Sequence, residues 1–261
     1  MEKLKFDVKQ VHEDIVSYIK NYMNKIGFKK AIIGLSGGVD SALVAYLLRD
    51  AIGAENVLAL MMPYKTSSKE SLEHAKLVLE DTGIIGELVE ITPMIDSYFE
   101  KIVDATPLRK GNKMARERMS ILYDYSAFQN RIVIGTSNKT ERMLGYSTQF
   151  GDSACAMNPI GDLYKTQIWE LSRYLGVPKV IIDKKPSADL WEGQTDEEEL
   201  GLTYELADKI LFRLVEEKKS LKEVISEGYD KDIVEKIVKK IKFSEFKRHM
   251  PEIYEIQKNG E

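Results

Sequence analysis

A short apolar run that leads through two adjacent glycines into a second apolar stretch constrains this chain more than any other feature. Residues 31–35 are apolar around Gly34 and have the length of a buried parallel strand. Residues 42–48 form a second apolar run that indicates a helix. The turn between them, residues 36–41, contains two glycines, two serines and Asp40. The segment therefore predicts the strand–turn–helix unit of an α/β fold.

The chemistry of this turn favours a metal–polyphosphate ligand. Backbone N–H groups at a helix N-terminus bind anions, and glycine lets the ligand approach them closely. A carboxylate in the same turn repels a bare phosphate, so Asp40 indicates that a cation lies between the two. The common P-loop is excluded, because no Lys-Ser or Lys-Thr pair follows the glycines. A glycine-rich turn without a ligand is the alternative.

The rest of the chain alternates between strand-like and helix-like segments as far as residue 163. We expect strands over 31–35, 57–62, 86–91 and 131–135, and helices over 8–25, 41–51, 68–81, 95–102 and 112–129. This order predicts a doubly wound, mostly parallel sheet with helices on both faces. Ligands bind such sheets beyond the carboxyl ends of the strands, where the strand order reverses.

From residue 164 onward the pattern is mainly helical, with helices expected over 165–175, 204–217, 221–226 and 233–241. We expect a single domain over 1–261, made of a nucleotide-binding core over about 26–163 and a helical C-terminal part over about 164–261. Two long polar stretches, 149–158 and 184–196, are long for simple connections and are therefore candidate functional loops.

Composition restricts the partners and the compartment. The net charge of −4 gives no indication of binding to nucleic acid or to an anionic membrane. A single cysteine rules out an internal disulfide, and no apolar stretch has the length of a membrane span. The first residues lack the apolar region of a signal peptide. We expect a cytoplasmic protein.

The turn at 36–41 resembles the SGGxDS loop of the ATP pyrophosphatases, which cleave ATP between the α- and β-phosphates. Further segments match one family among them, NAD synthetase, which amidates deamido-NAD. Residues 111–119 resemble its GN-x-x-AR-x-RM stretch, residues 135–141 its GTSNK-x-E motif, and residues 145–152 its G-x-x-T-x-x-GD loop. Residues 186–190 and 194–197 resemble its P-[TS]-ADL and Q-[ST]-DE segments. The chain is identified as a member on these motifs, which extend over nearly all of it.

This resemblance implies an adenine-nucleotide α-hydrolase-like fold and a ligase that uses ATP as co-substrate and Mg²⁺ as cofactor. Deamido-NAD is converted to NAD through a nicotinate acyl-adenylate, with release of pyrophosphate and AMP. Glutamine-dependent members carry an additional amidase domain for which this chain has no room, so ammonia is the expected nitrogen donor. The family also implies a homodimer, with the helix expected over 112–129 at its interface.

The resemblance also assigns site residues. Asp152 is expected to hold and deprotonate the incoming ammonium, Lys165 to stabilise charge during pyrophosphate release, and Ser187 to donate a hydrogen bond to ATP. Asp40 and Glu141 are the expected magnesium ligands. The expected ATP contacts are Gly34, Leu35, Ser36, Gly37, Gly38, Val39, Asp40, Ser41, Thr136, Lys165 and Ser187. The expected contacts to deamido-NAD are Arg116, Gln149, Ala156, Phe246 and Lys247.

Each assignment has a simpler alternative. Taken alone, Glu141 is interpreted as a surface residue and Lys165 as a solvated lysine. A lysine at the start of a helix is, however, unfavourable, because its charge is repelled by the positive end of the helix dipole. Cys155 has no catalytic partner nearby in the sequence and reads as a packing residue. Competing functions are a tRNA-modifying pyrophosphatase, and a nucleotide-binding module without catalysis.

Three positions depart from the pattern of many family members. Gln149 stands where Lys is common, Ala156 where Asp is common, and Phe246 where His precedes Lys247. All three concern the dinucleotide, and none concerns ATP or the metal. Either this subgroup binds deamido-NAD through other contacts, or the acceptor has changed.

Overall fold

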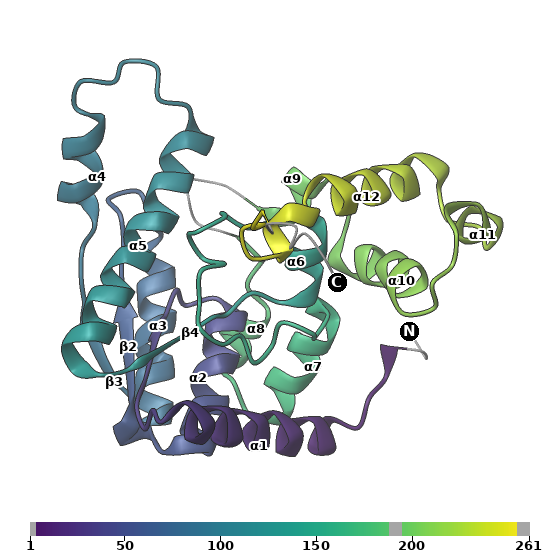
Figure 1. The fold of residues 1–261 in the computed structure, drawn as a ribbon. Helices are drawn as coiled ribbons and strands as arrows, with labels where there is room; N and C mark the ends of the chain where they lie inside the picture. Colours follow the sequence, from purple (N-terminus) through teal and green to yellow (C-terminus); the bar gives the residue numbers. More distant parts are fainter. Residues whose placement is uncertain (1–3, 188–194, 255–261) are drawn as a thin grey trace, which may run out of the picture.

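A parallel sheet forms the centre of the molecule. The computed structural model describes residues 4–187 and 195–254. Within these ranges the strands β1 (Ala31–Gly34), β2 (Val57–Met61), β3 (Ile85–Leu88) and β4 (Ile132–Ile134) form one sheet in the order β3-β2-β1-β4 (Figure 1). All pairings are parallel, and Ala31 lies opposite both Val57 and Ile132. The strand order therefore reverses beside β1, between the loops that follow β1 and β4.

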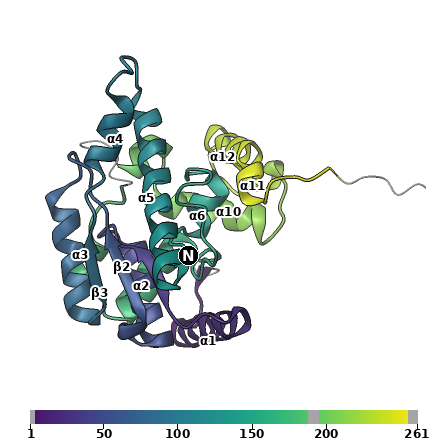
Figure 2. The ribbon, with the colours of Figure 1, turned by 60° about the vertical axis from the view of Figure 1, so that its left-hand side comes forward.

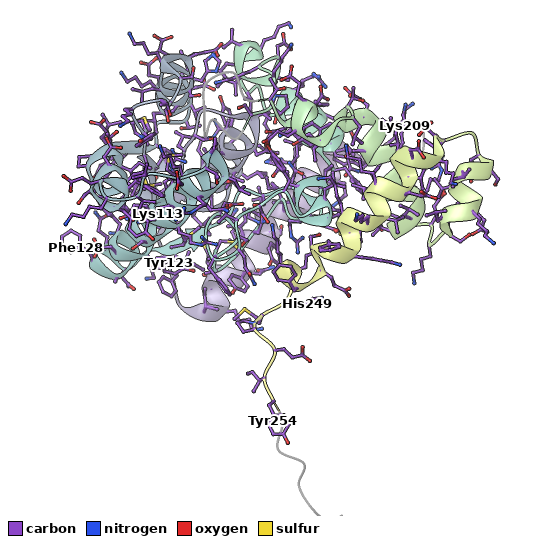
Figure 3. All side chains as sticks on the ribbon, turned by 90° about the horizontal axis from the view of Figure 1, so that it is seen from above. Lys113, Tyr123, Phe128, Lys209, His249 and Tyr254 are labelled. Carbon is purple, nitrogen blue, oxygen red and sulfur yellow. The ribbon has the colours of Figure 1, made fainter. Side chains whose placement is uncertain are left out.

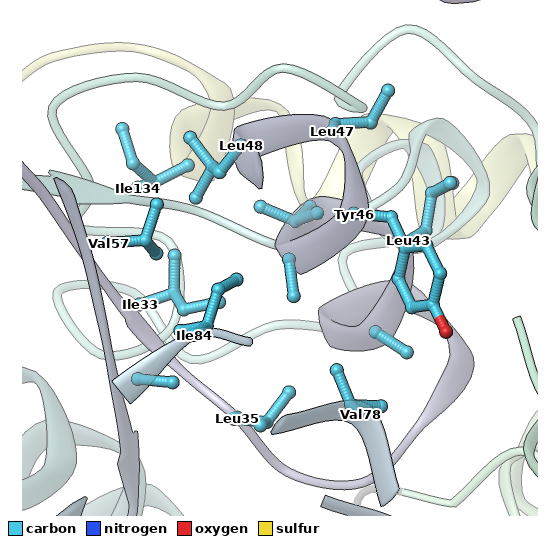
Figure 4. Packing of buried hydrophobic residues seen from close by; sticks show 14 of the residues in the cluster. Ile33, Leu35, Leu43, Tyr46, Leu47, Leu48, Val57, Val78, Ile84 and Ile134 are labelled. Carbon is cyan, nitrogen blue, oxygen red and sulfur yellow. The ribbon is translucent and has the colours of Figure 1, made fainter. Parts of the chain in front are cut away.

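Side chains along the strands alternate between two apolar cores, because successive residues of a strand point to opposite faces. Ala31 and Ile33 pack on one face with helices α1 (Val8–Ile26), α2 (Val39–Ile52), α3 (Lys69–Thr82), α7 (Lys165–Tyr174) and α8 (Lys179–Ile182) (Figure 4). Ile32 packs on the other face with α4 (Thr92–Phe99) and α5 (Pro107–Gln129). Both faces of the sheet are covered, as the sequence predicts.

A third apolar cluster holds the C-terminal helices together. It joins α6 (Lys139–Leu144), α9 (Asp196–Leu200), α10 (Tyr204–Val215), α11 (Leu221–Ser226) and α12 (Lys231–Phe243). A short 3₁₀ segment, η3 (Glu245–Arg248), follows α12, and another, η2 (Ala54–Asn56), precedes β2. Figures 1 and 2 show α10, α11 and α12 to one side of the sheet, with α6 between them and the strands, and Figure 1 shows α7 below α6.

The strands and longer helices lie at the predicted positions, and their ends differ for local reasons. Helix α5 begins at Pro107 rather than at residue 112, because Thr106 caps it and proline suits the first helical turn. Strand β3 ends at Leu88 rather than at residue 91 and lies at the sheet edge, where Ile85 and Leu88 are exposed. The sequence analysis did not predict the short helices α8 and α9. No helix in the described ranges combines the length and apolarity that crossing a bilayer requires.

Candidate functional site

The loop between β1 and α2 is shaped by its own serines. Ser36 Oγ accepts a hydrogen bond from the backbone N–H of Gly38 (3.2 Å) and lies 3.1 Å from Ser41 Oγ. Ser41 Oγ in turn donates to the carbonyl of Gly38 (3.0 Å) and accepts from the N–H of Ser36 (3.2 Å). No side chain caps the N-terminus of α2, where Gly38 is the capping residue. The loop is thus held in a fixed shape that leaves the N-terminus of α2 without a side-chain cap, which suits an anion.

Gly37 is required by both conformation and space. Its φ is +78°, in the left-handed region, where a side chain is strained. A Cβ atom at this position would lie 2.0 Å from the carbonyl oxygen of Ser71 in α3. The loop between β1 and α2, called the phosphate loop below after the ligand that the sequence predicts for it, therefore packs directly against the first turns of α3.

Helix α6 brings a second loop to the same place. Asn138 caps α6 by accepting a hydrogen bond from the N–H of Glu141 (2.9 Å), and its own N–H donates to Glu141 Oε2 (3.3 Å). The amide of Asn138 also donates to Asp40 Oδ1 (2.9 Å), across the point where the strand order reverses. One fully buried asparagine therefore fixes the orientations of both predicted metal ligands.

The Lys165 ammonium lies between these two carboxylates. Its Nζ is 2.5 Å from Asp40 Oδ2 and 3.6 Å from Glu141 Oε1, and its side chain is 3% exposed. Burial alone would lower the pKa of Lys165, but the carboxylates of Asp40 and Glu141 raise it above its ordinary value, so the lysine is charged. Burial, followed by the charge of Asp40, raises the pKa of Glu141 to about 8. The solvated alternative for Lys165 is wrong, and Glu141 is not a surface residue.

Two tyrosines support this cluster, Tyr204 from the start of α10 and Tyr146 from the loop that follows α6. The ring of Tyr204 lies under the Lys165 ammonium, with 5.1 Å between Nζ and the ring centroid. Its hydroxyl donates to Asp196 Oδ2 (2.9 Å), and the hydroxyl of Tyr146 donates to Asp196 Oδ1 (3.0 Å). Tyr204 therefore links the cation of the site to the first residue of α9.

Asp152 lies in the loop that follows α6. Its Oδ1 accepts a hydrogen bond from the N–H of Thr148 (2.7 Å), and its side chain faces the cleft. The carboxylate is open to solvent through the mouth of the cleft, yet the protein packed around it raises its pKa by desolvation. Lys247 supports the same loop by donating to the carbonyls of Gly145 (2.9 Å) and Ser147 (2.7 Å).

Most of these groups line one cleft of about 1060 Å³, which is large enough for two nucleotide substrates, and Asn138 and Tyr204 support it from outside the lining. The predicted residues among its lining are Gly34, Leu35, Ser36, Gly38, Val39, Asp40, Ser41, Thr136, Glu141, Asp152, Lys165, Ser187 and Lys247. Five predicted residues lie outside the lining: Gly37, Arg116, Gln149, Ala156 and Phe246. Among these five, Arg116 Nε donates a hydrogen bond to the carbonyl of Gln149 (3.2 Å). The carbonyl of Ala156 accepts a hydrogen bond from the hydroxyl of Tyr22 in α1 (3.1 Å).

The segment that carries Ser187 is tied to α3. Lys184 Nζ donates to Ser71 Oγ (2.8 Å) and lies 3.6 Å from Glu70 Oε2. Ser71 thus contacts both this segment and, through its carbonyl, the phosphate loop. The predicted motif residues at 188–190 and 194 lie outside the described residues.

Cys155 packs as predicted. It is partly buried in the core beside α5, and a Cβ atom added to Gly135 would lie 2.3 Å from its Sγ. Burial raises the pKa of its thiol, which disfavours the reactive thiolate.

Sequence reasoning did not assign the supporting residues Asn138, Tyr204, Asp196 and Lys184. Asn138 carries a local signal, because Asn followed three residues later by Glu is the pattern of a capping box, and Asp196 lies in the motif at 194–197. The others come from segments far from the loops that they support, and their contacts depend on the tertiary fold.

Comparison with known proteins places these features in a family context. A family model described as NAD synthase matches residues 11–251. A protein from Fusobacterium nucleatum named NH(3)-dependent NAD(+) synthetase is 62% identical over 258 residues, which are 99% of this chain and 100% of that protein. A protein of the same name from Trichlorobacter lovleyi is 52% identical, with 98% of this chain and 94% of that protein covered.

Two solved structures share the fold over nearly their whole length. An NMN synthetase from Francisella tularensis superimposes with a TM-score of 0.86 at 34% identity, covering 97% of this chain and all of that one. An NH3-dependent NAD synthetase from Campylobacter jejuni, in complex with a nitrate ion, superimposes with a TM-score of 0.82 at 36% identity, covering 96% and 100%.

Proposed function

This chain belongs to the NAD synthase family, and we propose that it converts deamido-NAD to NAD with ATP and ammonia. The observation that carries this proposal is the convergence of three groups in one cleft. These are the phosphate loop, the Lys165 ammonium held by Asp40 and Glu141, and the carboxylate of Asp152. The two relatives named for ammonia dependence are matched over 100% and 94% of their length, which supports ammonia as the nitrogen donor.

The reaction needs two steps, because a free carboxylate has no adequate leaving group. An oxygen of the nicotinate carboxylate attacks the α-phosphorus of ATP, the bond to the β-phosphate breaks, and pyrophosphate leaves. The nitrogen of ammonia then attacks the carbonyl carbon of the adenylate, and the bond to AMP breaks. The N–H groups of the phosphate loop and the Lys165 ammonium stabilise the charge that develops on pyrophosphate.

Asp152 serves the second step. Ammonium is the main form in neutral solution and has no lone pair, so it must lose a proton before it attacks. A carboxylate whose pKa is raised by desolvation accepts that proton more readily than an ordinary aspartate does. Ser187, at the edge of the same cleft, is proposed to donate a hydrogen bond to ATP.

The residues present fit Mg²⁺. Asp40 and Glu141 each place a carboxylate in the cleft beside the Lys165 ammonium, and they would supply two oxygen ligands to magnesium, which prefers a few carboxylates completed by phosphates and water. No group of three or more candidate metal-ligand side chains was found within the described ranges, so phosphate oxygens are needed to complete the site. When bound, the ion neutralises the phosphate charge beside Asp40.

We further propose a single-domain chain that acts as a homodimer in the cytoplasm. The contact between Lys165 of α7 and Asp40 of α2 joins the sheet unit to the C-terminal part and supports a single domain. Exposed aromatic side chains on α5 support the dimer, and the single cysteine agrees with a reducing compartment.

The proposal is tested by chromatography of a reaction containing ATP, Mg²⁺, deamido-NAD and either ammonium or glutamine. We expect NAD, AMP and pyrophosphate in equal amounts with ammonium, and little NAD with glutamine. ATP turnover without NAD would locate a defect in the ammonia step. No turnover of ATP with deamido-NAD would contradict the proposal.

A second candidate acceptor is the mononucleotide, deamido-NMN. It is favoured by the similarity to the Francisella tularensis protein, which is named NMN synthetase, and by the departures at Gln149, Ala156 and Phe246. The same assay separates the two when each acceptor is present at equal concentration. A larger kcat/KM for deamido-NMN would make the mononucleotide the main substrate.

A further inference from the structure

Most cations that line the cleft already have partners. Lys165 is paired with Asp40 and Glu141, and Lys184 with Glu70. Lys247 donates to two backbone carbonyls. Arg118 also lines the cleft, and its Nε donates to the carbonyl of Met62 (2.9 Å). These contacts join the walls of the cleft, and they give most of its positively charged side chains a partner within the protein.

Lys240 is different. It comes from α12, lines the cleft and is half-buried, yet no hydrogen bond or ion pair joins its ammonium to any residue that the structure describes. The other cleft lysine with no such contact in the described ranges, Lys185, is exposed. Helix α12 therefore brings to the substrate cleft a half-buried lysine whose ammonium has no hydrogen-bond or ion-pair partner among the described residues.

The surroundings of Lys240 disfavour the charged form of its side chain when no ligand is bound. Burial lowers the pKa of Lys240, the charges of Lys236 and Lys247 lower it further, and Glu199 opposes the shift. Burial likewise lowers the pKa of Lys247. Two lysines that repel each other in a partly desolvated cleft form a favourable place for an anion, whose binding offsets both the repulsion and the lost hydration.

This pair lies on the acceptor side of the cleft. The negative charge of Asp152, the carboxylate proposed for the amidation step, attracts the Lys247 ammonium. Lys165, in contrast, is paired with Asp40 beside the phosphate loop.

We propose that Lys240 binds an oxyanion of the acceptor substrate, either its carboxylate or its phosphate, beside Lys247, which the family resemblance already assigns to the acceptor. The inference rests on the proposed function, since it takes the acceptor to be a nicotinate nucleotide. It assigns a binding role to α12 beyond its packing against α6 and α10.

The test compares the wild-type protein with Lys240→Gln, Lys240→Arg and the control Lys239→Gln. Lys239 is the exposed neighbour on the same helix, so its replacement makes the same change in net charge outside the cleft. We expect Lys240→Gln to raise the KM for deamido-NAD on the order of tenfold, the loss typical of one charged hydrogen bond, with the KM for ATP and kcat nearly unchanged. Lys240→Arg should recover most of the affinity, and Lys239→Gln should resemble wild type.

Calorimetric titration identifies the oxyanion. NAD contains the pyrophosphate but carries an amide where deamido-NAD has a carboxylate. Equal weakening of both ligands by Lys240→Gln indicates the pyrophosphate, and weakening of deamido-NAD alone indicates the carboxylate. Unchanged affinity for both, or a change in the KM for ATP alone, overturns the inference. A wild-type protein that binds deamido-NAD but makes no NAD contradicts the proposed function instead.

Discussion

Some residues around this cleft have no room for a larger side chain, and Gly37 is the clearest case. We expect Gly37→Ala to force the phosphate loop away from Ser71, because the added Cβ would meet the carbonyl oxygen at 2.0 Å. The left-handed backbone adds about 1–2 kcal/mol of strain. The KM for ATP should rise at least about tenfold, since the displaced N–H groups no longer converge on the phosphates.

The control for this prediction is Gly27→Ala. Gly27 has nearly the same φ, +79°, but an added Cβ would meet nothing within 4 Å. It should lower stability through backbone strain alone and leave the KM for ATP unchanged. Equal KM values for the two variants would show that contact with Ser71 does not shape the loop.

Tyr204 allows two effects to be separated at one residue. Tyr204→Phe retains the ring beneath Lys165 and removes the hydrogen bond to Asp196, which should cost about 1 kcal/mol of stability. Tyr204→Leu also removes the cation–π contact, so the KM for ATP should rise severalfold beyond that of the Phe variant. Thermal unfolding and steady-state kinetics measure the two effects. Identical KM values in both variants would exclude a role for the ring in placing Lys165.

At the scale of elements, the position of α6 depends on its N-cap residue, Asn138. Asn138→Asp keeps an N-cap acceptor but places a second carboxylate against Asp40 in a fully buried position. We expect it to lower the stability of the ligand-free protein more than Asn138→Ala, which loses the cap at about 1 kcal/mol. Ser220→Ala removes the same kind of cap from the exposed start of α11 and should leave activity intact. An Asn138→Asp variant as stable as wild type would contradict the prediction.

The same scale shows what the sequence could predict. Strands β1, β2 and β4 are buried on both faces, so their apolar runs are continuous and visible. Edge strand β3 is half exposed and its predicted end was wrong by three residues. Likewise, the phosphate loop is a local motif and was predicted, whereas Tyr204 reaches Lys165 only because α10 packs against α7. Contacts between distant segments carry no spacing that a single sequence reveals.

At the scale of the whole molecule, the exposed aromatic residues predict how copies of the chain associate. On α5, Phe128 is 82% exposed and Tyr123 is 43% exposed, and Figure 3 shows the two on the same flank. Large exposed aromatic side chains on one flank are typical of an interface. We therefore expect light scattering to give about twice the 29.8 kDa chain mass.

Replacing one of these aromatic residues by a charge should dissociate the dimer without unfolding the chain. Phe128→Asp would bury an unpaired carboxylate at the interface, and we expect a monomer at micromolar concentration. Val180→Asp, on α8 at the other face of the sheet, makes the same kind of change at an exposed apolar residue and should leave the dimer intact. If acceptor contacts such as Arg116, which lies outside the cleft lining, are completed across this interface, Phe128→Asp will also raise the KM for deamido-NAD. A monomeric variant with an unchanged KM would mean that each chain binds the acceptor alone.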